Sequence, residues 1–272
     1  MQLLSSLLPK TLLTTGAALA VFALTASATQ AQVLYRQTYG TTSNNSSFSN
    51  VGWTVATGAT ATNYTSTFNT ADGLGGWLNN SGGTPQNLPN VNTGGTSASE
   101  SLGLAVVSLT NSSNRLGMLY TTQFSLNPAD YAGLTFSWNQ GNASTNIAYR
   151  VAIQIGGSWY ASSQSFANTT AVGSVANFAT QSEAKSFAFS NLAASWLALD
   201  FTLGSELELG SALSSNLPTG NITGFGIYMA SSSGATARMD TFTITAVPEP
   251  TTSAMLLLGA AGSLLISRKR RA

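Results

Sequence analysis

Glu206 and Glu208 carry the carboxylates whose spacing comes closest to catalytic chemistry. Separated by one residue, they would share one side of a β-strand, and most glycoside hydrolases use a pair of carboxylates to cut a glycosidic bond. Leu207 and Leu209 alternate with the two acids, so a strand with one side in solvent explains the same pattern. The two acids alone therefore do not predict an enzyme.

Histidine and cysteine are both absent from the chain. Their absence removes the most common general base, the usual zinc ligands and the central residue of Ser-His-Asp and Cys-His arrangements. Only carboxylate or lysine chemistry would remain open to an enzyme. We therefore predict a protein without catalytic activity, and glycoside hydrolase or lyase activity is a remote alternative.

Aromatic side chains beside glycines form a second group of candidates. Trp159 and Tyr160 follow a Gly-Gly-Ser sequence, and Trp77 follows two glycines. An exposed ring can pack on the C–H face of a pyranose while nearby amides and hydroxyls bond to the sugar hydroxyls. If the glycines lift these rings clear of a sheet, all three residues are candidate carbohydrate-binding residues. The alternative is a place in the core, which strand parity predicts for Trp138.

Alternation of apolar and polar residues predicts β-strands along most of the chain. It is clearest over 146–155, where every second residue is large and apolar. Further strands are predicted at 33–39, 102–106, 116–124, 134–139, 157–165, 187–189, 197–203, 225–229 and 239–246. Gly, Asn and Ser separate these strands, which favours an all-β fold: an antiparallel two-sheet sandwich of the jelly-roll or concanavalin-like kind. Residues 56–99, biased to Thr, Ser, Asn and Gly, are predicted as long loops.

The segment 224–244 resembles the closing strands of jelly-roll carbohydrate-binding modules. It reads Gly-Phe-Gly-Ile-Tyr-Met, then a turn of small residues, then Arg-Met-Asp-Thr-Phe-Thr-Ile. The resemblance implies a structural calcium ion held in part by Asp240. Gln37 and Thr38 stand where the resemblance places a second acid, and Ca²⁺ favours several charged oxygen ligands. The alternatives for Asp240 are an ion pair with Arg238 and a boundary position where the acid reaches solvent.

Both ends of the chain contain processing signals. Lys10 precedes an apolar stretch and then small residues, which predicts a secretory signal peptide over 1–31, cleaved after Ala28 or Ala31. At the other end, Val247-Pro248-Glu249-Pro250 precedes an apolar run over 253–266 and a basic cluster. That cluster consists of Arg268, Lys269, Arg270 and Arg271. Its charge favours the cytoplasmic side of a bilayer, so the bulk of the chain is predicted to face outward.

This tail resembles the PEP-CTERM sorting signal, which combines the same three parts in the same order. The resemblance implies a substrate of exosortase, a membrane protease that cuts near the Pro-Glu-Pro sequence, in a bacterium that makes exopolysaccharide. An ordinary membrane anchor is the alternative, but the apolar run would span only about 21 Å as a helix. The predicted organisation is a signal peptide (1–31), a β-sandwich domain (32–246) and a sorting signal with a hydrophobic helix (247–272).

Charge separates the domain from its two ends. Acids outnumber basic residues between Gln32 and Ala246, so the formal charge of +1 comes from the ends. Without a basic patch, the domain lacks the positively charged surface that nucleic-acid binding requires. We therefore predict a non-catalytic exported protein of the cell surface or extracellular matrix that associates with exopolysaccharide. Signal peptidase and exosortase would process it during a transient stay at the inner membrane. A specific carbohydrate-binding module is the alternative, and no cofactor is predicted beyond the calcium ion.

Overall fold

A computed structural model describes residues 31–40, 46–58, 64–65, 74–79, 103–109, 115–203 and 206–248. All of them belong to one compact unit, Ala31–Pro248. The predicted signal peptide, except for Ala31, lies outside the described residues, as does the tail from Glu249 onward with its basic cluster. Within the described part of the chain, no helix is long and apolar enough to cross a bilayer.

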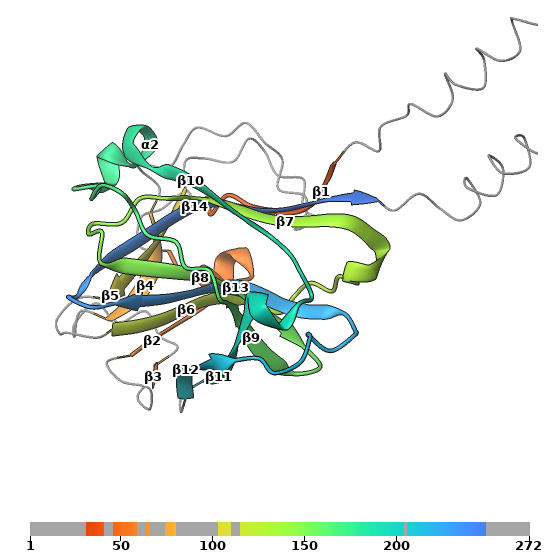
Figure 1. The fold of residues 1–272 in the computed structure, drawn as a ribbon. Coiled ribbons are helices and arrows are strands. Elements are labelled where there is room, and N and C mark those ends of the chain that lie inside the picture. Colours follow the sequence, from red (N-terminus) through yellow and green to blue (C-terminus); the bar gives the residue numbers. More distant parts are fainter. Residues whose placement is uncertain are drawn as a thin grey trace, which may run out of the picture. The chain divides into compact units, whose positions relative to one another are not determined.

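Two antiparallel sheets make up this unit (Figure 1), which confirms the predicted all-β architecture. The first sheet has the order β10-β7-β14-β5-β4, and β1 also pairs with β14. Its strands are β1 (Gln32–Gln37), β4 (Leu74–Asn79), β5 (Leu104–Leu109), β7 (Tyr131–Gln140), β10 (Glu183–Ala188) and β14 (Ala235–Pro248). The first and last strands of the unit are therefore neighbours, with Gln32 opposite Ala246.

The second sheet has the order β12-β11-β9-β8-β13-β6-β2-β3. Its strands are β2 (Thr54–Gly58), β3 (Tyr64–Thr65), β6 (Arg115–Thr121), β8 (Ile147–Ile155), β9 (Ser158–Ser162), β11 (Trp196–Thr202), β12 (Glu206–Ala212) and β13 (Ile222–Ser231). Helical turns are short: η1 (Phe48–Val51), η2 (Pro128–Asp130), η3 (Val175–Asn177), α2 (Phe178–Gln181) and η4 (Ala193–Ser195). Most connections between successive strands cross from one sheet to the other, as in a sandwich, whereas β4 is followed by β5 within the same sheet.

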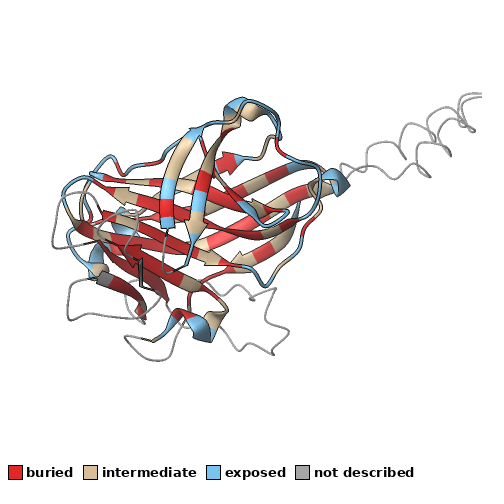
Figure 2. Ribbon diagram, turned by 90° about the horizontal axis from the view of Figure 1, so that it is seen from below, coloured by how far each residue is buried: buried red, intermediate tan, exposed pale blue. Residues whose placement is uncertain are grey.

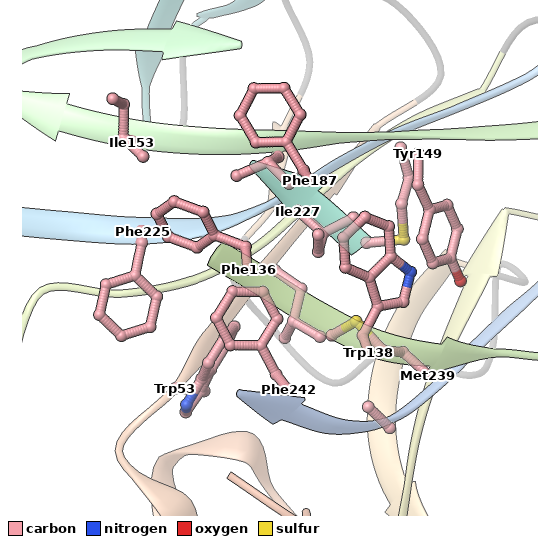
Figure 3. Close-up of a cluster of buried hydrophobic side chains, with 14 of the residues drawn as sticks. Trp53, Phe136, Trp138, Tyr149, Ile153, Phe187, Phe225, Ile227, Met239 and Phe242 are labelled. Atoms are coloured by element: carbon pink, nitrogen blue, oxygen red, sulfur yellow. The ribbon is translucent and has the colours of Figure 1, made fainter. Parts of the chain in front are cut away.

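The core lies between the two sheets and is rich in aromatic side chains (Figure 3). Phe225 on β13 and Phe242 on β14 stack with their ring centroids 5.5 Å apart and their planes 6° from parallel. Trp138 is 2% exposed, as its strand parity predicts. Buried residues follow the strands of both sheets, whereas exposed residues concentrate in the connecting segments (Figure 2).

The prediction of loops over 56–99 is wrong in part, because β2, β3 and β4 occupy some of these residues. Glycine explains the error at β4. A Cβ at Gly76 would come within 2.8 Å of the Phe48 ring and 3.0 Å of the carbonyl oxygen of Val106. The strand therefore has glycine where neighbouring groups approach closely, and the same composition reads as a loop in the sequence.

Candidate functional site

Trp159 and Tyr160 lie on β9 and point to opposite faces of the second sheet. Trp159 is 7% exposed and belongs to a cluster built entirely from strands of that sheet, whereas Tyr160 is half-buried against the inter-sheet core. The prediction that glycines lift the Trp159 ring clear of the sheet is therefore wrong. Gly156 and Gly157, with φ of 60° and 87°, form the two-residue turn between β8 and β9. Such hairpin turns need positive φ at both central residues, which is why glycine occurs there.

Trp159 is covered because the second sheet curls. Tyr120 on β6 and Phe201 on β11 are separated by three strands, which is about 19 Å in a flat sheet. Their ring centroids are nevertheless only 5.1 Å apart. The Trp159 ring lies 5.5 Å from Tyr120 and 5.8 Å from Phe201. The concave outer face of the sheet is thus filled by its own aromatic rings, which leaves Trp159 little surface for a sugar.

Trp77 lies on β4 and is also less open than its glycine neighbours suggest. Its side chain is half-buried and packs against a small cluster of Leu104, Val106 and Phe178. One part of the ring therefore stabilises the fold, while the other part faces solvent. A role for Trp77 or Tyr160 in sugar binding remains a prediction.

Glu206 and Glu208 are exposed on β12, and Leu207 between them is fully buried. Asp200 on β11 lies opposite Glu208, so a third acid shares this region. Because β12 is the last described strand of the second sheet, the two glutamates occupy a solvent-facing edge, and Asp200 lies on the strand beside it. This geometry matches the alternative in which the two glutamates are surface residues.

Glu183, at the start of β10, holds two segments together. Its Oε1 accepts hydrogen bonds from the backbone N and the Oγ1 of Thr169, both at 2.7 Å, and Lys185 Nζ lies 2.6 Å from Oε2. Burial alone would raise the pKa of Glu183, but the bonds from Lys185 and Thr169 outweigh burial and lower the pKa to about 2. A general acid needs a pKa near the working pH, so Glu183 is a structural anion.

Asp240, the predicted calcium ligand, is buried with 1% of its surface exposed. The pairing of β14 with β7 shifts just after Asp240, and Thr241 has a φ of 50°, which is rare for a β-branched residue. The hydroxyl oxygens of Thr38 and Thr241 are buried and have no hydrogen-bond partner among the described residues. Arg238, the alternative ion-pair partner, donates from Nη1 to the carbonyl oxygen of Val172 at 2.7 Å.

Ca²⁺ favours several oxygen ligands with charged carboxylates among them, and Asp240 is a single carboxylate. The Gln37 side chain is bonded within the chain: its Oε1 accepts from Tyr39 N at 2.8 Å and its Nε2 donates to Val51 O at 3.1 Å. Among the described residues, no group of three or more acidic, His or Cys side chains is arranged to hold a metal. Asp240 would supply one carboxylate, and a calcium ion here remains a prediction.

If this prediction is correct, calcium should stabilise the protein through Asp240. A Ca²⁺ concentration about a hundredfold above the Kd should raise Tm by about 5 °C or more, because the ion binds the folded state alone. Asp240→Asn, which keeps the shape of the side chain, should abolish this shift. Melting curves with Ca²⁺ and with a chelator test the prediction, and equal Tm values for the wild-type chain in both would contradict it.

The first two residues of the sorting motif belong to the folded unit. Val247 and Pro248 end β14, where they lie opposite Gly133 and Tyr131 of β7. Glu249 and Pro250 lie outside the described residues. The motif therefore begins within the last strand of the domain.

An open pocket that sequence reasoning missed lies beside this strand end. Its volume is about 390 Å³, and Tyr131, Phe189 and Thr219 are among its lining residues. The lining comes from four stretches that are far apart in sequence: before and within β7, at the end of β8, after β10 and before β13. No local motif could have indicated it.

The C-terminal sequence matches one protein-family model, the PEP-CTERM protein-sorting motif, over residues 246–271. This match confirms the resemblance drawn from Val247-Pro248-Glu249-Pro250, the apolar run and the basic cluster. It indicates an exported protein that exosortase processes at the membrane.

Several solved structures are similar to the chain. Two are structures of the family 11 carbohydrate-binding module from Clostridium thermocellum, one from a cellulosomal cellulase and one in complex with a β-1,3-1,4-mixed-linked tetrasaccharide. Both are 13% identical to this chain, and both alignments cover 80% of it. The alignments cover 95% and 100% of the two modules, with TM-scores of 0.39 and 0.40 respectively. An exo-β-agarase is 10% identical over 80% of this chain and 25% of its own, with a TM-score of 0.37. No curated protein sequence matches the chain.

Proposed function

We propose that the chain is a non-catalytic protein of the cell surface or extracellular matrix, and that its β-sandwich associates with exopolysaccharide after exosortase has released it. The observation that carries this proposal is the PEP-CTERM motif, which begins within the last residues of β14. The folded unit is thereby joined directly to a sorting signal. Contact with the membrane would end when the tail is removed.

The composition of the chain supports an uncharged polymer as the partner. Charged residues make up only 7% of the chain. Hydroxyl and amide side chains must therefore supply most of the polar surface, and these groups both donate and accept hydrogen bonds, as sugar hydroxyls do. Such a surface favours weak, distributed contact with polysaccharide.

Processing at both ends is the first test of this function. We expect the protein recovered from the extracellular matrix to begin at Thr29 or Gln32 and to lack the basic cluster from Arg268 to Arg271, because each end carries the signal that its protease recognises. Intact-mass spectrometry measures both ends at once. In cells without exosortase, the C-terminal tail should remain.

A matrix protein that still carries the basic cluster would contradict exosortase release and favour a simple membrane anchor. The second candidate function, a specific carbohydrate-binding module, is favoured by one observation, the pocket beside Tyr131.

A further inference from the structure

The pocket beside Tyr131 lies at one end of the sandwich, where both sheets contribute to it. Tyr131 and Leu134 come from β7 of the first sheet, Ile155 from the end of β8 in the second, and Leu217 from the segment before β13. Its volume of about 390 Å³ is within the range of roughly 300–1,000 Å³ that is typical of small-molecule sites. Trp159, Tyr160 and Trp77 do not line it, so it is separate from the positions predicted from sequence.

Two aromatic side chains form part of the pocket wall, and both are held in place. Phe189 is half-buried, its ring centroid lies 5.9 Å from that of Trp196, and its backbone N donates to Leu134 O at 2.8 Å. Tyr131 is half-buried against the core, and its backbone N donates to Pro128 O where η2 ends. Because both rings pack against neighbouring side chains, binding a ligand would cost little ordering of these side chains.

Polar groups without a charge complete the pocket. The carbonyl oxygen of Asn191 accepts a hydrogen bond from Leu217 N at 2.9 Å, which joins two sides of the pocket. The side chains of Asn191 and Thr219 make no hydrogen bond within the described part of the chain, so their amide and hydroxyl are available to a ligand. All residues that line the pocket are described, and none of them carries a charge.

We propose that this pocket binds one pyranose unit of a neutral polysaccharide. The apolar face of the sugar ring would pack on Tyr131 and Phe189, while Asn191 and Thr219 bond to its hydroxyl groups. A uronic acid or a sulfated sugar fits poorly, because its charge would enter the pocket without a counter-charge. A purely apolar ligand fits poorly as well, because it would leave the amide and hydroxyl without partners. The proposal rests on the proposed association with polysaccharide and gives that association a site.

Retention on immobilised polysaccharide tests the pocket. The full-length chain in detergent is applied to neutral β-glucan, galactan and mannan, and to a polyuronate as the anionic contrast. We expect retention on at least one neutral polymer and none on the polyuronate. Tyr131→Ala should weaken binding to the retained polymer by about tenfold or more, as truncation of a central contact residue does. Tyr131→Phe, which keeps the ring, should bind nearly as well as the wild-type chain.

Matched variants separate binding from folding and from the other candidate positions. Asn191→Ala and Thr219→Val change exposed side chains, so together they should weaken binding without lowering Tm even if Tyr131→Ala does not fold. Leu192→Ala, an exposed change outside the pocket lining, is the control and should bind normally. Loss of binding in Tyr160→Ala or Trp77→Ala, with binding intact in the pocket variants, would place the site elsewhere on the domain.

The possible outcomes test the sugar-binding pocket and the association with polysaccharide separately. If a neutral polymer retains the wild-type chain and the Asn191→Ala/Thr219→Val chain equally, the pocket is not the sugar-binding site. The association with polysaccharide is then still supported. Retention on the polyuronate alone would also overturn the neutral site. If no polysaccharide retains the wild-type chain, both the pocket and the proposed association are wrong.

Discussion

Replacing Trp138 by Ala is expected to lower the free energy of unfolding of the processed protein by about 3–5 kcal/mol. Trp138 is 2% exposed, and its ring meets the edge of Phe166 with centroids 5.0 Å apart. Its Nε1 also donates to Gln140 Oε1 at 3.1 Å. The substitution would leave a cavity between the sheets and remove that hydrogen bond. Urea denaturation of the two proteins measures the difference.

Two further variants show whether the loss of stability in Trp138→Ala comes from the burial of this side chain. Trp138→Phe loses the N–H donor and a small part of the ring but keeps most of the apolar volume, so its cost in stability should be clearly smaller. Leu203→Ala, at a residue that is 44% exposed, should change the stability by no more than about 0.5 kcal/mol. Equal effects of Trp138→Ala and Leu203→Ala would contradict the placement of Trp138 in the core.

Asn168→Ala is expected to cost about 2–3 kcal/mol, a large effect for the loss of one polar side chain. Asn168 is 4% exposed. Its Oδ1 accepts from Gln140 Nε2 at 3.2 Å and from Asn142 N at 3.1 Å, and its Nδ2 donates to Gln140 O at 2.9 Å. Alanine would remove all three bonds and leave the buried Asn142 N–H without this acceptor. The same denaturation experiment measures the cost.

Asn146→Ala is the matched control for this substitution. Asn146 is exposed and donates from Nδ2 to Ser233 Oγ at 2.9 Å, so its replacement should cost well under 1 kcal/mol. A similar loss of stability in both variants would show that burial does not strengthen the bonds of Asn168.

The sequence predicted those features that depend only on residues close together in the chain. Residues 146–155 alternate strictly, and β8 (Ile147–Ile155) lies there because a strand with one face in the core imposes a period of two. The sorting tail is likewise a local motif. By contrast, β4 was missed, because Gly76 is set by the close approach of Phe48 and Val106.

The candidate site depends on features that no local pattern contains. Trp159 is covered because the curl of the second sheet brings Phe201 to Tyr120, and this curl is a property of the whole sheet. The pocket arises where Tyr131, Phe189 and Thr219 meet from three separate stretches of chain. Alternation predicts which face of a strand is apolar, but it does not predict how far a sheet curls or which loops meet at its end.

The most direct test of the proposed function is the distribution of the processed protein between extracellular matrix and medium, in cells that make exopolysaccharide and in cells that do not. Quantitative mass spectrometry of both fractions measures it. We expect the processed protein to be in the matrix of the producing cells and to shift to the medium when the polysaccharide is absent. A protein that remains with the cells in equal amounts in both strains would contradict association with exopolysaccharide.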